Sequence, residues 1–367
     1  MSFAPERLRD VRIRNGHTVE ALAKKCGVSK QVISKYETGQ TIPSEDVLQK
    51  IVAYYGLPVE YLTKENILPK ERSAVFYRKT TRMPKRELDS VQVSMKWLYE
   101  IIVAVKENQP LQSVFLPSVE NNFSIEEKAL ILRKKWGLGL SPIADLADVL
   151  EKQGAHLFTT HLEDIKIDGY SQLIGKEAII VLNQDRGSFA RKNFSLAHEM
   201  GHLMLHTNEE FDGSLQKEEQ ADDFAGCFLI PEIAFRKDVQ GMIRINVESL
   251  KKLSEKWYVS PQAVLERCFK LDMLGKNLEE SKARRQALFQ RLNQRDYFEL
   301  QTVRMCSIEN ALRKIDSDEQ MRKNFLESVR IPVYEIQKLL QLPNIFEKGL
   351  EETESVDDID GIQLSFA

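Results

Sequence analysis

Two histidines four residues apart, with a glutamate directly after the first, are the clearest candidates for chemistry in the chain. They form His198-Glu199-Met200-Gly201-His202, inside the stretch FSLAHEMGHLMLH. Residues four apart lie on one face of an α-helix, so both imidazoles can bind the same ion. Glu199 lies one step around the helix, where a carboxylate can take a proton from water. The spacing therefore predicts Zn2+ as the cofactor, held by His198 and His202, with Glu199 as the catalytic base.

A catalytic zinc site usually has three protein ligands and one position for water. The next predicted helix, in EEQADDFAGCFLIP, places Glu218 and Asp222 one turn apart on the same face. We expect Glu218 to be the third ligand and Asp222 to accept the outer N–H of a ligand histidine, which fixes the tautomer of that ring. Glu219 stays open as an alternative third ligand, because it is adjacent in the sequence but points about 100° away around the helix.

Other side chains near the motif have weaker claims to a role. His206 continues the four-residue series from His202, but we expect it to end the helix, where a histidine suits the helix dipole. The pattern HExxHxxGxxH is excluded, because Leu205 and Asn208 stand where it needs Gly and His. Beyond zinc itself, the candidates for stabilising an oxyanion are Tyr170 and His161.

A second pattern lies in the first 63 residues. A helix after Thr18, a turn through Gly27 and Val28, and a helix ending near Tyr36 have the spacing of a helix-turn-helix. Gln can read adenine, and Lys can reach guanine or phosphate. We expect double-stranded DNA to contact the outward-facing polar residues of the second helix, which are Ser29, Lys30, Gln31, Ser34 and Lys35.

Both patterns resemble known families. The segment from about 125 to 270, with the blocks AIIVLN, RKNFSLAHEMGHLMLH and EEQADDFAGCFLIP, resembles the ImmA/IrrE family of bacterial metallopeptidase-like proteins. This resemblance implies a zincin-like core of the gluzincin type, with zinc on His198, His202 and Glu218 and with Glu199 as the base. Residues 6–63, which include YETGQTIPS, resemble the Xre/Cro family of DNA-binding domains.

The N-terminal part of the chain is predicted to be a DNA-binding domain followed by a linker. In residues 1–63, turn signals such as GVS and GQTIPS separate five short helices. Residues 64–89 carry eight Lys/Arg against four Asp/Glu and two prolines, which is typical of a basic linker.

Residues 90–272 are predicted to be the metallopeptidase-like domain. Strand candidates lie at 154–160 and 178–183, two helices follow at about 190–206 and 216–229, and Ser124 and Glu127 form a capping box for an earlier helix. A helical C-terminal region of unassigned role follows at 273–350, and an acidic tail at 351–367. The chain is therefore predicted to be mainly α with a small β component, an α+β fold.

Composition narrows the class of protein. A chain of 367 residues, 42% hydrophobic and 29% charged, should hold two or three domains and is neither collagen-like nor wholly disordered. Four scattered cysteines without a CxxC pair argue against a disulfide framework, and no apolar stretch approaches 18 residues. We therefore expect a cytoplasmic, nucleoid-associated bacterial protein.

The net charge of -3 hides a small basic excess in residues 1–63, where nine Lys/Arg stand against seven Asp/Glu. So small an excess predicts modest affinity for one DNA half-site, which favours a homodimer on a two-fold operator.

Two functions fit these observations. In the first, a DNA-binding regulator is fused to a zinc endopeptidase that cleaves a repressor or antitoxin-like protein and so relieves repression. In the second, the peptidase-like domain senses or binds a protein, and the chain regulates transcription without proteolysis.

Overall fold

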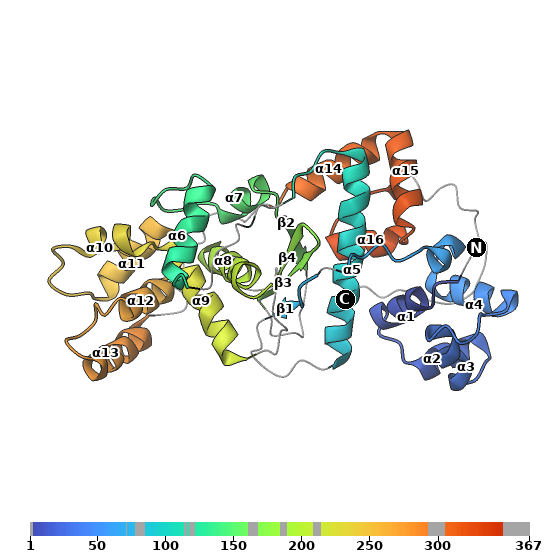
Figure 1. The fold of residues 1–367 in the computed structure, drawn as a ribbon, viewed down its shortest axis with the longest axis horizontal. Helices are drawn as coiled ribbons and strands as arrows, with labels where there is room; N and C mark the ends of the chain where they lie inside the picture. The colour runs from blue at the N-terminus through green and yellow to red at the C-terminus, as the bar shows by residue number, and fades with distance from the viewer. Residues whose placement is uncertain are drawn as a thin grey trace.

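The computed structural model describes residues 3–70, 72–77, 85–113, 116, 122–160, 168–183, 189–207, 214–292 and 305–347. The molecule is elongated, with the N-terminal helices at one end, α10–α13 at the other, and a sheet between them (Figure 1). Within the described ranges, no helix is both long and apolar enough to cross a membrane. The predicted acidic tail and His161 lie outside these residues.

The central sheet has four strands in the order β1-β3-β4-β2. They are β1 Phe76–Tyr77, β2 His156–Thr160, β3 Gly169–Ile174 and β4 Glu177–Asn183. β4 pairs in parallel with β2 and antiparallel with β3, and β1 pairs antiparallel with the other edge of β3, which sets Phe76 opposite Ser171. The predicted strands at 154–160 and 178–183 are confirmed as β2 and β4.

Both faces of the sheet are buried, which explains why β4 is apolar from Ala178 to Leu182. Ile179 and Val181 belong to one core, and Ala178, Ile180 and Leu182 belong to the other. The first core includes the N-terminal helices. We call it the reader-side core, because the sequence predicts that these helices read DNA bases. The second, the metal-side core, includes the helix that carries HExxH.

The N-terminal domain consists of four α-helices and a 3-10 helix: α1 Pro5–Arg14, α2 Val19–Cys26, α3 Lys30–Glu37, α4 Glu45–Tyr55 and η1 Val59–Thr63. Thr18 caps α2 by accepting the backbone N–H of Ala21, and Gly27 ends that helix with a left-handed φ of 70°. Ser29 then caps α3. These local signals produce the predicted helix-turn-helix, and the fifth helix is a single 3-10 segment.

Eight helices contribute to the metal-side core: α6 Ile125–Lys135, α7 Leu146–Lys152, α8 Phe189–Leu205, α9 Leu215–Leu229, α10 Glu232–Val239, α11 Val247–Trp257, α12 Pro261–Lys270 and α13 Leu278–Arg291. The capping box of Ser124 and Glu127 is present at the start of α6. The predicted helices at 190–206 and 216–229 are α8 and α9. Together with the sheet they give the α+β fold expected from the sequence.

A long helix joins the N-terminal domain to the other face of the sheet. This helix, α5, spans Lys85–Asn108 and packs on α1, α15 and β4. The remaining helices on this side are α14 Ser307–Ser317, α15 Glu319–Val329 and α16 Val333–Leu340. Glu100 of α5, 2% exposed, bonds Arg7 at 2.6 Å and Lys64 at 2.9 Å. These buried ion pairs join the N-terminal domain to α5.

Packing groups the chain differently from the predicted division. The segment predicted as a linker supplies β1 and the start of α5, and α5 shares its core with the N-terminal domain. α13, which the sequence placed in the C-terminal region, packs on α12 and belongs to the metal-side core. The reason is tertiary: α5 buries apolar residues on several faces because partners surround it.

Candidate metal centre and DNA-binding helix

The metal centre depends on the close packing of α8 against α9. A Cβ atom on Gly201 would lie 3.1 Å from the Ala221 carbonyl oxygen and 3.2 Å from Phe224 Cβ. Glycine is therefore needed at this helix position, because any side chain would push the two backbones apart. This contact brings the start of α9, with Glu218, against the HExxH motif.

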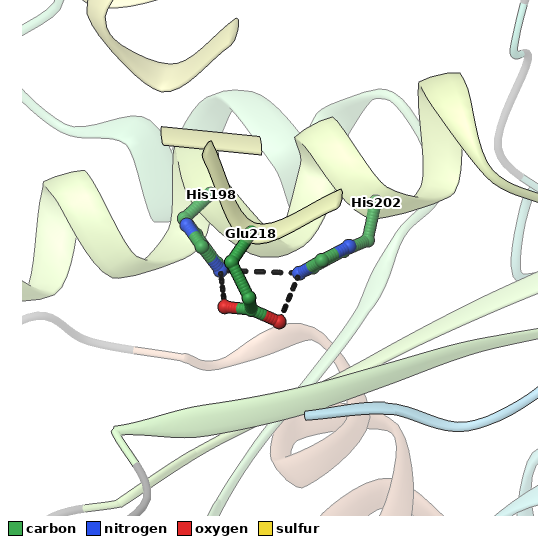
Figure 2. A group of neighbouring side chains, drawn as sticks. All are labelled: His198, His202 and Glu218. Carbon is green, nitrogen blue, oxygen red and sulfur yellow. Dashed lines mark hydrogen bonds and ion pairs between the residues drawn. The ribbon is translucent and has the colours of Figure 1, made fainter. Parts of the chain in front are cut away.

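Three predicted ligands meet in one buried cluster, formed by His198, His202 and Glu218 (Figure 2). The Nε2 atom of His198 lies 3.4 Å from Glu218 Oε2, and the Nε2 atom of His202 lies 3.5 Å from Glu218 Oε1. The two Nε2 atoms are 3.1 Å apart. Ligands about 2.0–2.1 Å from a tetrahedral zinc ion lie about 3.4 Å from each other, so these separations suit zinc.

The polar atoms in the cluster also fit a cation. Both carboxylate oxygens of Glu218 are buried, and neither has a hydrogen-bond partner among the described residues. A buried carboxylate is costly unless a cation or a hydrogen bond compensates it. Glu219, the alternative ligand, is exposed and lies outside the cluster. The donor set of two imidazoles and one carboxylate is that of a catalytic zinc site.

Asp222 orients the first histidine. Its Oδ1 accepts a hydrogen bond from Nδ1 of His198 at 2.8 Å, which leaves Nε2 as the ligand nitrogen. Burial alone would lower the pKa of His198, but the hydrogen bond to Asp222 and the nearby carboxylates of Glu218 and Glu199 raise it to about 9. Without a metal, this imidazole therefore carries a proton at neutral pH.

Glu199 is buried beside the cluster and is held by the sheet. Ser171 of β3 donates from Oγ to Glu199 Oε2 at 2.6 Å. β3 approaches this closely because it has Gly169, where a Cβ atom would lie 2.9 Å from the Val181 carbonyl oxygen and 3.4 Å from Glu199 Oε1. The hydrogen bond fixes the orientation of the carboxylate at the position that the sequence predicts for a base.

Other side chains near the motif lie in places that the sequence did not reveal. His206 follows the last residue of α8, as expected, but is 1% exposed and bonds His202 and Gln220. The ring of Phe76 stacks on His202, with centroids 5.2 Å apart. Tyr170 packs in the reader-side core, on the opposite sheet face from Ser171, so it is not an oxyanion donor; burial raises its pKa to about 12.

The five residues predicted to contact DNA are all exposed on α3 or at its N-terminus: Ser29, Lys30, Gln31, Ser34 and Lys35. Ile33 and Tyr36 on the opposite face are buried in the reader-side core. The helix thus presents a polar face with one amide, two ammonium groups and two hydroxyls, groups that can read base edges and bind phosphates.

Comparison with known proteins agrees with the assignment of both domains. Residues 8–62 match the helix-turn-helix family model, and residues 150–269 match the model of the IrrE N-terminal-like domain, a peptidase family. The metal cluster and the five polar residues of α3 lie within the matched ranges.

Two individual proteins are also similar. The cryptic phage CTXphi transcriptional repressor RstR of Vibrio cholerae is 25% identical over 112 residues, which are 30% of this chain and 96% of RstR. A crystal structure of Bacillus thuringiensis PlcR in complex with the peptide PapR7 and DNA covers 91% of this chain and 95% of PlcR, with 11% identity and a TM-score of 0.17. That TM-score is too low to compare the folds. The family matches support a regulator that joins a helix-turn-helix domain to an IrrE N-terminal-like domain.

Proposed function

We propose that the chain is a transcription regulator with a zinc-dependent endopeptidase domain, and that it cleaves a repressor or antitoxin-like protein to relieve repression. The observation that carries this proposal is the buried cluster of His198, His202 and Glu218, with Glu199 fixed beside it. A site built only for structure would close the metal with a fourth protein ligand, and the described residues bring three together.

Each residue of the metal site has its own role in hydrolysis. His198, His202 and Glu218 would hold a zinc ion, which would supply the Lewis-acid chemistry that activates water and polarises a carbonyl. Glu199 takes a proton from the attacking water and returns it to the leaving amide nitrogen. Ser171 keeps the Glu199 carboxylate in the orientation that both transfers need.

The exposed polar face of α3 binds an operator. Gln31 and Lys35 contact bases or phosphates in the major groove, and Ser29, Lys30 and Ser34 position the helix. The small basic excess of the N-terminal domain supports binding as a homodimer to a two-fold site. Cleavage and DNA binding thus belong to one chain, joined through the buried bonds of Glu100.

The similarity to RstR favours a second candidate function. RstR is a transcriptional repressor, and the chain matches 96% of its length. In this alternative, the protein represses transcription, and its peptidase-like domain senses or binds a protein without cutting it. Cleavage of a peptide bond distinguishes the two candidates, because only the first requires it.

The test is proteolysis of candidate substrates. Purified protein is incubated with the repressors encoded beside its gene, with and without a chelator, and fragments are identified by mass spectrometry. The proposal predicts a single cleavage that the chelator abolishes, that Glu199→Gln abolishes with zinc retained, and that the exposed control Glu219→Gln preserves. Cleavage by Glu199→Gln at the wild-type rate would remove Glu199 from the mechanism.

DNA binding has a separate test. Gel retardation on the upstream region of its own gene should weaken steeply as salt rises, and Gln31→Ala and Lys35→Ala should each weaken it further. Retardation that neither substitution changes would show that α3 is not the recognition helix.

A further inference from the structure

The two metal-binding histidines are oriented by different groups. His198 has a carboxylate at its Nδ1, that of Asp222, at 2.8 Å. His202 has another imidazole there: its Nδ1 lies 3.1 Å from Nδ1 of His206. The Nε2 atom of His206 lies in turn 2.9 Å from Oε1 of Gln220. Three side chains therefore form a continuous hydrogen-bonded chain that ends at the metal site.

Metal binding allows only one arrangement of the protons that link His202, His206 and Gln220. The Nε2 atom of His202 faces Glu218 and must offer its lone pair to the ion, so its Nδ1 carries the proton. His206 must then accept at Nδ1, which places its own proton on Nε2. Gln220 accepts a hydrogen bond from this N–H with its carbonyl oxygen, and a side-chain amide always has this acceptor.

We propose that His206 and Gln220 are positioning residues for the metal site, which hold His202 in the tautomer that binds zinc. The inference rests on the metal site of the proposed function and assigns roles to two residues that are not ligands. His206 is 1% exposed and His202 is fully buried, so bulk water is excluded from the bond between the two imidazoles. The ring of Phe76, stacked on His202, fixes the ring plane in which they form.

The arrangement gives α9 a larger role than supplying one ligand. Glu218, Gln220 and Asp222 follow one another at every second position near the start of this helix. The first binds the metal, the second ends the chain that orients His202, and the third orients His198. One rigid element therefore sets the ligand and both orienting groups, and the close contact at Gly201 fixes them all relative to α8.

Affinity for zinc alone, measured by competition with a chromogenic chelator, tests the proposal. Gln220→Leu removes the acceptor and should weaken zinc binding about 10-fold to 100-fold, the usual effect of losing an orienting partner. Gln220→Glu keeps the shape, accepts more strongly, and should bind zinc more tightly than wild type. Gln216→Leu, the same substitution at an exposed position of α9, is the matched control and should not change the affinity.

These variants separate the possible outcomes. If Gln220→Leu binds zinc as tightly as Gln216→Leu, or if Gln220→Glu binds more weakly than wild type, the positioning role is wrong while the metal site stands. If wild type itself binds no zinc, the metal site of the proposed function fails, and the positioning role falls with it.

A spectroscopic measurement distinguishes orientation from packing. Imidazole nitrogen chemical shifts report which ring nitrogen carries the proton. In zinc-loaded protein, His206 should be protonated at Nε2 and His202 at Nδ1. A proton on Nδ1 of His206 would contradict the proposal, since that nitrogen could not then accept from His202.

Discussion

The contact between α8 and α9 at Gly201 makes a sharp test, because one added methyl group should disturb the metal site without touching a ligand. In Gly201→Ala, the new Cβ atom would lie 3.1 Å from the Ala221 carbonyl oxygen and 3.2 Å from its Cα. Those atoms belong to the backbone of α9, so the helix must move by a few tenths of an ångström. Glu218 and Asp222 are carried on the same helix and move with it.

The expected magnitude follows from two opposing effects. Replacing glycine by alanine inside a helix stabilises it by about 0.5–1 kcal/mol. Overpacking a close contact costs about 1–3 kcal/mol. Gly226 on α9 gives the matched control, because the nearest atom to its added Cβ is Arg267 Cδ at 4.0 Å. Gly226→Ala should therefore gain the helix stabilisation without the overpacking cost. The free energies of unfolding of the two variants should differ by about 1–3 kcal/mol.

Urea denaturation of the metal-free variants measures this difference, and chelator competition measures zinc binding. Gly226→Ala should be slightly more stable than wild type, with the same zinc affinity. Gly201→Ala should be less stable than Gly226→Ala and should bind zinc about tenfold or more weakly. Equal stability of the two variants, with wild-type zinc affinity in both, would refute the idea that this contact positions α9.

Three further predictions concern other bonds. Asp222→Asn should lower zinc affinity about 10-fold to 100-fold, since His198 loses a charged acceptor, and an unchanged affinity would contradict this. Glu100→Leu should cost about 3–5 kcal/mol in urea denaturation, because two buried cations lose their partner; a cost below about 1 kcal/mol would contradict that role. Burial opposes ionisation of Glu177, but hydrogen bonds from His156 and Lys106 lower its pKa to about 2, below the usual 4.5. Its stabilising effect is present above pH 4.5 and lost as pH falls toward 2, so wild type should lose more stability than Glu177→Gln over that range.

Local geometry explains why much of the metal site could be predicted. His198 and His202 share a helix face because four residues make about one turn. Glu218 and Asp222 were predictable for the same reason, since the spacing within each helix follows from the sequence. What the spacing left open was the choice between Glu218 and Glu219, which depends on how α9 docks on α8.

The orienting residues depend on contacts between distant segments. Ser171 reaches Glu199 from 28 positions earlier in the chain, and Gln220 reaches His206 from 14 positions later. β3 was not predicted, because its central residues, Ser171 and Gln172, are polar. They interrupt the apolar run that is typical of a buried strand. Their polarity is explained by their bonds, that of Ser171 to Glu199 and that of Gln172 to the Ser73 carbonyl oxygen.

The division into domains was harder still to predict. Periodicity identifies α5 as a helix but cannot say which core it joins. In the structure, Glu100 and the apolar residues of α5 connect it to the N-terminal domain. A two-residue strand such as β1 carries too little pattern for any rule of alternation to find it.

The most direct test of the account is the metal content of purified protein. We predict about one zinc per chain by elemental analysis, lost in His198→Ala and retained in Glu199→Gln, because the first removes a ligand and the second removes only the base. Protein that binds no zinc when the metal is supplied, or that binds it equally well as His198→Ala, would contradict the central claim that these residues form a metal centre.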